Sequence, residues 1–192
     1  MRYWYDTEFL EDGRTIELIS IGIVAEDGRE YYAVNRDFRW RRIAGRCWYA
    51  PWQIETRQQW LADNVVPSLP RLHGDAINLY SGRGPLGMID WQALEMRRRD
   101  TIAAEVRDFL LAGPSFPKLW TWYGAYDHVV LCQLWGRMID LPHGIPMYSR
   151  DLKQEVDRVG DPTLPEQPDG VHNALADARH LRTRHLALES AA

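Results

Sequence analysis

Two acids near the start of the chain, Asp6 and Glu8, are separated by a single residue. In a β-strand, side chains alternate between the two faces, so both carboxylates would point the same way and repel each other. A hard divalent cation relieves that repulsion, because Mg²⁺ takes oxygen ligands, often one or two carboxylates together with a substrate phosphate. The spacing alone decides little, since a chain with this many acids contains about one Asp-x-Glu by chance.

A second pair, His172 and Asp177, stands at the two ends of the run HNALAD. His172 follows a loop rich in proline and glycine, and Asp177 would lie one turn into a helix whose other face is apolar. Imidazole has an unperturbed pKa of about 6.5, which suits proton transfer near neutral pH. The alternative, with His172 as a helix cap and Asp177 as a solvated surface charge, is favoured while this segment is considered alone.

A third acid, Asp127, follows an apolar segment that is expected to form a buried strand, and it stands at the start of the next helix. An aspartate in a first turn commonly does no more than interact with the helix dipole. However, ligand sites in open α/β sheets lie beyond the ends of the strands, and Asp127 is expected at such an end. Together the three segments offer four carboxylates and one imidazole to a single cleft.

The elements that position these residues are predicted from hydrophobic periodicity and turn residues. Strands are predicted at residues 2–8, 16–24, 29–35 and 118–124. The run Glu26-Asp27-Gly28 predicts a hairpin turn. Helices are predicted at residues 54–66, 100–112, 126–138, 150–159 and 172–188, and a long loop or insertion at 71–98. Asp100 or Thr101 is expected to cap the second helix.

This order of elements predicts an α/β fold with a mixed central sheet, its first three strands antiparallel, flanked by helices. No repeat and no linker rich in glycine, proline or serine divides the chain. We therefore expect one domain over residues 1–192, with a variable region around 36–98.

Composition excludes several classes of protein. With 192 residues, 45% hydrophobic and 26% charged, the chain is globular in composition, and no run approaches the ~18 apolar residues of a membrane span. Asp6 and Glu8 stand where a signal peptide needs apolar residues. Cys47 and Cys132 are too few for a disulfide framework, so a cytoplasmic protein is expected. A net charge of −4 argues against binding nucleic acid by bulk charge alone.

The order Asp-x-Glu, Asp, His-x4-Asp resembles the DEDD family of 3′-to-5′ exonucleases, in the subclass with a catalytic histidine, which is built on the ribonuclease H-like fold. The run HNALADA (172–178) matches the third family motif at every specified position, and DTE (6–8) matches the first. The second motif departs, with YGAYD in place of an asparagine-containing run, and Phe9 and Leu10 replace the usual hydroxyl residues after the first. With these departures, the sequence looks like the actinobacterial exoribonucleases of the RNase AS type, which prefer adenylate-rich RNA. The runs that carry this likeness are DTEF, WYGAYDHVVLCQLWG and VHNALADAR.

The resemblance implies a metal-dependent 3′-to-5′ exoribonuclease that releases nucleoside 5′-monophosphates from single-stranded RNA or an RNA 3′ overhang. Two Mg²⁺ ions, or Mn²⁺ as a substitute, would clamp the scissile phosphate. The metal ligands would be the carboxylates of Asp6, Glu8, Asp127 and Asp177. His172 would act as the general base that takes a proton from the attacking water. A homodimer is also implied, and no membrane partner is expected.

Aromatic side chains beside the acids are candidates for substrate binding, because the bases of a single strand stack on aromatic rings. Phe9 and Tyr126 are the first candidates. Trp122 is a further candidate, although core packing is favoured for it, and Thr7 is also included as a substrate contact. The tryptophans that could serve the core, an interface or RNA are Trp40, Trp48, Trp52 and Trp60. The arginines that are expected on a solvated face more than on RNA phosphates are Arg36, Arg39, Arg41, Arg42, Arg46, Arg97, Arg98 and Arg99.

Two other functions stay open on these grounds. A DNA exonuclease of the proofreading or repair type would share every catalytic residue, because recognition of the 2′-hydroxyl depends on pocket geometry that spacing does not reveal. A nucleic-acid-binding module without turnover is the alternative from another class. The presence of all four acids and of His172 argues against the binding module.

Overall fold

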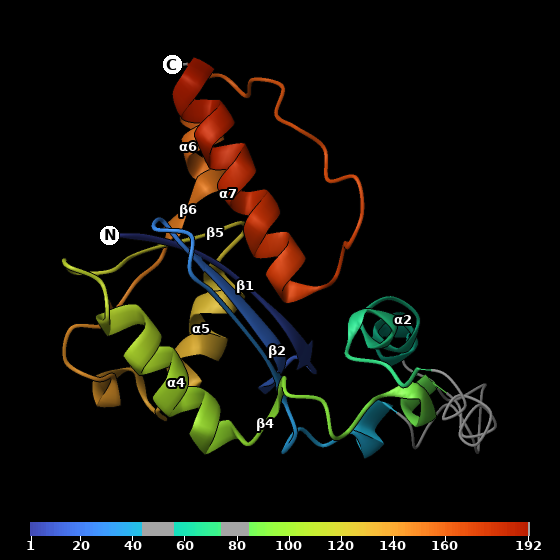
Figure 1. The fold of residues 1–192 in the computed structure, drawn as a ribbon. Helices are drawn as coiled ribbons and strands as arrows, with labels where there is room; N and C mark the ends of the chain where they lie inside the picture. Colours follow the sequence, from blue (N-terminus) through green and yellow to red (C-terminus); the bar gives the residue numbers. More distant parts are fainter. Residues whose placement is uncertain (44–55, 74–84, 192) are drawn as a thin grey trace.

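Six strands form one mixed sheet among the residues that this computed structural model describes, which are 1–43, 56–73 and 85–191. In sheet order they are β4 (Met96–Arg97), β3 (Glu30–Asn35), β2 (Ile16–Ala25), β1 (Arg2–Glu11), β5 (Lys118–Thr121) and β6 (Arg150–Asp151). The first three strands in the chain pair antiparallel, and the other pairs are parallel. The mixed sheet with an antiparallel start is thus confirmed (Figure 1).

The central hairpin forms where the sequence is apolar with hardly a break. β2 is buried along most of its length, as expected of a strand covered on both faces. The hairpin turns at Gly28, whose φ of +91° favours glycine, and the Ala25 N–H donates to the Arg29 carbonyl across the turn (2.8 Å). β5 ends at Thr121 rather than at 124 as predicted, because Tyr123 adopts a φ of +54° and turns the chain into the next helix.

The α-helices that the structure describes in full are α2 (Thr56–Asn64), α4 (Arg99–Leu111), α5 (Ala125–Gln133), α6 (Leu152–Arg158) and α7 (Ala174–Ala191). Each overlaps a predicted helix, and 3₁₀ turns add η2 (Val66–Ser68), η4 (Pro85–Met88) and η5 (Met138–Asp140). The predicted cap of α4 is wrong: the helix begins at Arg99, so Asp100 lies within its first turn and accepts from the Thr101 N–H. None of these described helices is long and apolar enough to cross a membrane.

Helices cover both faces of the sheet (Figure 1). On one face, α4 and α5 pack against a cluster that includes Tyr3 and Tyr5 of β1. On the other face, α6 and α7 pack against Trp4. Because side chains alternate along a strand, Asp6 and Glu8 point to the same face as Trp4, which is the face that α7 covers.

The middle of the chain builds a second core. It packs Leu61 of α2 and Val66 of η2 against Leu10 of β1 and Ile19 of β2. The prediction of a loop over residues 71–98 is wrong in part, because η4 and β4 lie within it and β4 pairs with β3. A strand of two residues is too short to leave a periodic pattern. Outside the described residues lie 44–55 and 74–84, and with them Arg46, Cys47, Trp48 and Trp52.

Candidate active site

The start of helix α7 lies directly on the sheet, and Gly22 of β2 makes that contact possible. A Cβ added at Gly22 would meet the Ala174 carbonyl carbon and the Leu175 nitrogen at 2.3 Å, so any side chain there would push the helix away. Gly22 pairs with Asp6 across the β1–β2 ladder. The first turn of α7 therefore lies beside Asp6, and it brings Asp177 to the acids of β1.

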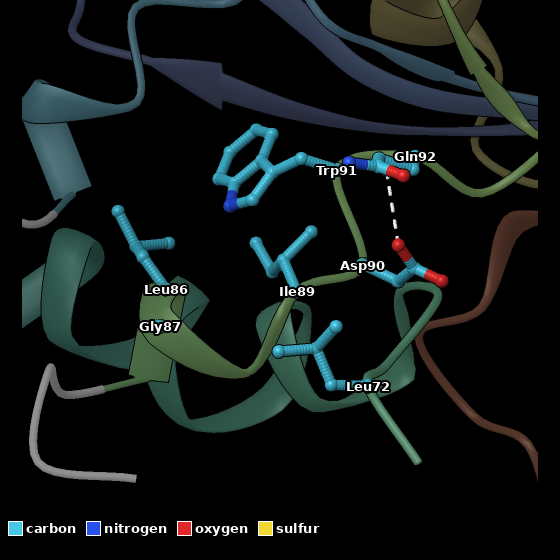
Figure 2. A pocket seen from close by; sticks show the side chains of 7 residues that line it. All are labelled: Leu72, Leu86, Gly87, Ile89, Asp90, Trp91 and Gln92. Carbon is cyan, nitrogen blue, oxygen red and sulfur yellow. Dashed lines mark hydrogen bonds between the residues drawn. The ribbon is translucent and has the colours of Figure 1, made fainter. Parts of the chain in front are cut away.

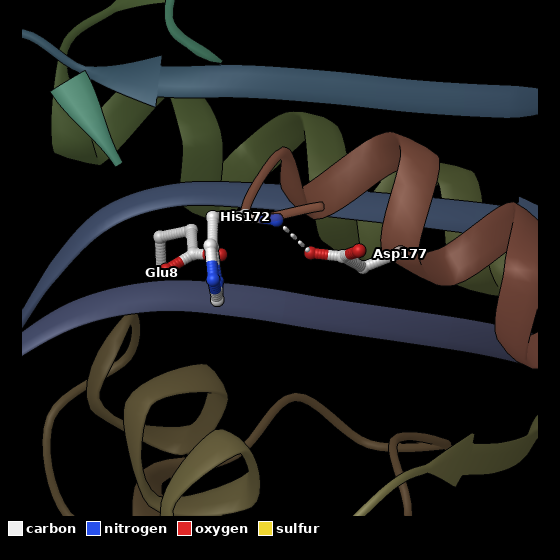
Figure 3. Close-up of side chains that lie close together, drawn as sticks. All are labelled: Glu8, His172 and Asp177. Atoms are coloured by element: carbon white, nitrogen blue, oxygen red, sulfur yellow. Dashed lines mark hydrogen bonds between the residues drawn. The ribbon is translucent and has the colours of Figure 1, made fainter. Parts of the chain in front are cut away.

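Glu8, His172 and Asp177 form the centre of the site (Figure 3). Their ligand atoms, one from each side chain, all lie within 4.8 Å of one another. Asp177 Oδ2 accepts from the His172 backbone N–H (3.0 Å), and Asp177 Oδ1 accepts from Gln167 Nε2 (2.7 Å). Glu8 is buried and the other two are half-buried, so Asp177 is no solvated surface charge.

Asp127 reaches the site at the edge of β1. The pairing of β5 with β1 ends at Trp4. Beyond that point the Asp127 carboxylate, and not β5, accepts a hydrogen bond from the β1 backbone. Its Oδ1 accepts from the Thr7 backbone N–H (2.9 Å) and from the Thr7 hydroxyl (2.6 Å). Because Thr7 separates Asp6 from Glu8, these two bonds hold the buried Asp127 carboxylate at the level of the β1 acids.

The four predicted substrate contacts lie in two kinds of environment. Phe9 and Tyr126 stack on each other with ring centroids 6.0 Å apart and an interplanar angle of 29°, and Tyr126 is 56% exposed. Thr7, in contrast, is buried and uses its hydroxyl within the protein. Trp122 packs in part against the core cluster around Trp4, which is the role favoured for it. Contact of these four side chains with a substrate stays a prediction.

Three carboxyl groups of the site, those of Asp6, Asp127 and Asp177, have raised pKa values because burial disfavours their charged form. Burial raises the pKa of Asp6 well above its usual range, and the charge of Asp127 raises it further. Burial also raises the pKa of Asp127 to about 6, although the bonds from Thr7 act in the opposite direction. The pKa of Asp177 is raised by burial as well. The surrounding protein therefore does little to stabilise these carboxyl groups in their ionised form.

The donor set fits a hard divalent cation. Carboxylate oxygens are the ligands that Mg²⁺ and Mn²⁺ prefer, and an imidazole nitrogen is compatible with Mn²⁺. Such atoms of Glu8, Asp177 and His172 lie within 4.8 Å of one another, and the carboxylates of Asp6 and Asp127 stand near them, outside that close group. A cation bound at this place would stabilise the ionised form of the carboxyl groups whose pKa burial raises.

Several residues that hold this site belong to no motif that the sequence could reveal. Gln167 donates to Asp177, and the Ser68 hydroxyl donates to the His172 carbonyl (2.5 Å). The centroid of the Trp60 ring lies 4.7 Å from the centroid of the His172 imidazole. Asp151 accepts from two backbone N–H groups of the turn before α5, at 3.2 Å each. All of these contacts join segments that are distant in the sequence or irregular in structure, so periodicity gives no trace of them.

Some of the described arginines of the middle region are paired with acids. Arg39 lies 2.9 Å from Glu17, and Arg42 contacts both Glu17 (3.2 Å) and Asp12 (2.7 Å). Pairs of this kind at the surface contribute about 0–1 kcal/mol each. The arrangement agrees with the solvated face that was expected of these arginines.

A separate pocket lies in the middle region (Figure 2). Its described lining consists of Leu72, Leu86, Gly87, Ile89, Asp90, Trp91 and Gln92. This lining is mainly apolar, and its carboxylate, that of Asp90, accepts from the Gln92 N–H (3.0 Å). Neither His172 nor any of the four acids belongs to the lining, so the pocket is distinct from the acidic site.

The fold is of the mixed α/β class, and its site places Glu8 of the sheet and Asp177 of a helix start within 4.8 Å of His172, while Asp127 of a second helix start bonds to β1. The chain is 43% identical over 180 residues to the 3′-5′ exoribonuclease Rv2179c of Mycobacterium tuberculosis strain H37Rv, and equally to the 3′-5′ exoribonuclease MT2234.1 of strain CDC 1551. Each match covers 93% of this chain and 88% of the relative. No protein-family model matches the chain. The chain belongs to the family of these 3′-5′ exoribonucleases.

Proposed function

We propose that this chain is a divalent-metal-dependent 3′-5′ exoribonuclease of the DEDD type with a catalytic histidine, a single catalytic domain on a ribonuclease H-like fold. The observation that carries the proposal is the cluster of Glu8, His172 and Asp177 within 4.8 Å. The buried Asp127 carboxylate, bound to Thr7, supports it. The names of the two relatives support the direction of cleavage and the RNA substrate.

Two divalent ions, Mg²⁺ or Mn²⁺ in its place, would be held by Asp6, Glu8, Asp127 and Asp177. When bound, such ions neutralise charge on the scissile phosphate and on the leaving 3′-oxygen. Thr7 holds the Asp127 carboxylate against β1, and Gln167 holds the carboxylate of Asp177. Because these bonds already fix the oxygens, little rearrangement is needed as charge develops during the reaction.

His172 takes the proton of the attacking water in this proposal. An imidazole with a pKa near neutrality is an efficient base at the pH of the cell. Its distance from the oxygens of Glu8 and Asp177 would also suit a metal ligand. The two roles differ in one respect: a base can be removed without loss of metal binding, and a ligand cannot.

The stacked pair of Phe9 and Tyr126 would bind bases at the 3′ end of single-stranded RNA or of an RNA 3′ overhang. Phe9 directly follows Glu8, and Tyr126 directly precedes Asp127. Stacking on such rings contributes about 1–3 kcal/mol per base, and differences in stacking strength produce modest base preferences. A preference for adenylate-rich RNA, with release of nucleoside 5′-monophosphates, is therefore part of the proposal.

The active form is proposed to be a homodimer. The family resemblance implies this, and exposed apolar side chains such as Phe116 and Ile139, 74% and 76% exposed, are available for such a contact. Light scattering during gel filtration gives the mass directly, and a particle of one 22.4 kDa chain would contradict the dimer.

One set of assays tests the proposed reaction. The wild-type protein is incubated with Mg²⁺ and 5′-labelled oligo(A), an RNA of mixed sequence, or single-stranded DNA, with EDTA as the control. We expect shortening of RNA from the 3′ end, fastest for oligo(A), and no cleavage in EDTA. Faster cleavage of DNA would identify a DNA exonuclease, and binding without cleavage of any strand would identify a binding module.

A further inference from the structure

The backbone of His172 lies in the left-handed region, with a φ of +67°. A residue with a Cβ adopts this conformation at a cost in free energy, so it persists only where surrounding contacts hold it. His172 lies two residues before the start of α7 and outside the regular elements. Contacts from elsewhere in the fold must therefore hold it.

Residues 60–69, which run from α2 through η2, supply such contacts, and we call them the brace segment. The Ser68 hydroxyl donates to the His172 carbonyl (2.5 Å), sharing its proton with the Val65 carbonyl (2.9 Å). In the opposite direction, Asn173 Nδ2 donates to the Ser68 carbonyl (2.9 Å). Two hydrogen bonds thus join positions that are 104 and 105 residues apart in the chain.

Asn173 extends this contact to the helix and to the sheet. Its Oδ1 accepts from the Ala176 N–H (3.1 Å) in the first turn of α7, as the side chain of a helix cap does. Its Nδ2 lies 3.3 Å from the Tyr32 hydroxyl on β3 as well as close to Ser68. One side chain therefore ties the start of α7, and with it the adjacent His172, to two other elements.

Trp60 contacts the side chain of His172. The two rings meet edge to face, with centroids 4.7 Å apart and an interplanar angle of 78°. The indole is 41% exposed, so it stands at the rim of the site. The brace segment itself is anchored by Val65, Val66 and Leu69, all buried in the second core. The Trp60 ring therefore occupies space directly beside the imidazole of His172.

We propose that the brace segment positions His172 for catalysis, with Ser68 and Trp60 as positioning residues. The inference rests on the proposed function, which gives His172 the proton transfer from the attacking water. Proton transfer requires the base within hydrogen-bond reach, and a small displacement of such a group lowers the rate strongly. We therefore expect the brace segment to act on turnover, and to reach the carboxylates only through the His172 N–H that donates to Asp177.

The kinetics of matched variants test whether the brace segment acts on turnover and not on the binding of substrate or metal. Ser68→Ala removes the hydroxyl, and we expect kcat on oligo(A) to fall about tenfold while KM and Mn²⁺ affinity stay within about twofold. Ser68→Thr keeps a hydroxyl and should restore most of kcat. Trp60→Ala should lower kcat about three- to tenfold, whereas Trp60→Phe, which keeps a ring, should not. The control is Ser190→Ala near the end of α7, where the hydroxyl donates to the Leu186 carbonyl (2.8 Å); no change is expected.

Hydrogen exchange adds a readout that does not depend on activity. Peptides that span residues 168–176 are followed by mass spectrometry in the wild type, Ser68→Ala, Trp60→Ala and Ser190→Ala. We expect several-fold faster exchange in this stretch for Ser68→Ala and wild-type exchange for the control. Should Ser68→Ala fail to fold, the partly exposed Trp60 variants carry the test.

Three results would overturn the inference: a rise in KM with unchanged kcat, an equal loss of Mn²⁺ affinity, or exchange identical to the wild type in Ser68→Ala. The first would make the segment a substrate-binding surface, and the second would make it a general support of the site. If the wild-type protein degrades no RNA, the proposed function fails, and the exchange data still decide whether the brace segment holds His172.

Discussion

The acids and the histidine of this site are held in different ways. Asp6 lies on β1 within an antiparallel ladder, and Asp127 and Asp177 lie in the first turns of two helices. His172 instead has left-handed backbone angles, and a hydroxyl from Ser68 bonds to its carbonyl. Groups that repel one another thus stand on regular elements, while the group that would move a proton stands on a loop supported by contacts from the middle of the chain.

Because the acids and His172 are held in different ways, we expect their variants to behave differently. Substitution of an acid should change metal binding and the stability of the metal-free protein along with turnover, because burial makes its charge costly. Substitution at His172, or at the residues that hold it, should change turnover and leave metal binding unchanged. The largest effects are expected among the acids.

Asp6→Asn keeps the size of the side chain and removes its charge. We expect turnover to fall by roughly three orders of magnitude or more, with loss of Mn²⁺ affinity. In EDTA at pH 7 the variant should melt at a higher temperature than the wild type, because burial and the charge of Asp127 disfavour the ionised Asp6. Cleavage assays, calorimetric titration with Mn²⁺ and thermal melts measure the three quantities; retained turnover would exclude Asp6 from the site.

His172→Ala should lower turnover by about 10²–10⁴-fold, the usual contribution of a general base. Mn²⁺ affinity and melting temperature should match the wild type. The same titration and melts as for Asp6→Asn give the comparison. If His172→Ala binds Mn²⁺ as weakly as Asp6→Asn does, His172 is a ligand, and the contrast between acids and histidine fails.

Thr7→Val tests how the third acid is held, because it removes the hydroxyl that donates to Asp127 (2.6 Å) and keeps the shape of the side chain. We expect kcat to fall about tenfold and unfolding free energy to fall by about 1–2 kcal/mol, because a buried carboxylate loses a donor. Thr183→Val on α7 is the matched control, since its hydroxyl donates to the Arg179 carbonyl at the surface (3.1 Å). Equal behaviour of the two variants would show that Asp127 does not depend on Thr7.

The last expected effect is on stability alone and not on turnover: the pH dependence of stability without metal. Asp127 has a pKa of about 6 when folded, against about 3.9 in an unfolded chain. Between these values the folded state binds more protons than the unfolded state, so stability falls as pH rises from about 4 to 6 and levels off above. The melting temperature of Asp127→Asn relative to the wild type, in EDTA, should therefore increase across this range. A constant difference would contradict the raised pKa.

Much of the fold could be predicted from the sequence, because local patterns determine it. The apolar run of β2 and the turn at Gly28 predict the hairpin, and alternation along β1 predicts that Asp6 and Glu8 share a face. The short strand β4 could not be predicted, because two residues show no period and their pairing depends on β3.

The site could be predicted only as far as its motifs reach. Residues 172–178 point to His172 and Asp177, and the family resemblance accounts for Asp127. Thr7 is a predicted substrate contact, and no pattern in the sequence indicates that its hydroxyl would bond to Asp127, which it does because α5 approaches β1 where β5 ends. Ser68 and Trp60 meet His172 through tertiary contacts alone, which a single sequence does not reveal.

Cleavage of oligo(A) by the wild type and by Asp6→Asn tests whether the acidic site hydrolyses RNA from the 3′ end. A 5′-labelled oligo(A) is incubated with Mg²⁺ and either the wild type or Asp6→Asn, and products are resolved by length while released nucleotides are identified by mass. With the wild type we expect a ladder that shortens from the 3′ end and release of adenosine 5′-monophosphate, and with the variant we expect intact RNA. Intact RNA with the wild type, or the same ladder with Asp6→Asn, would contradict it.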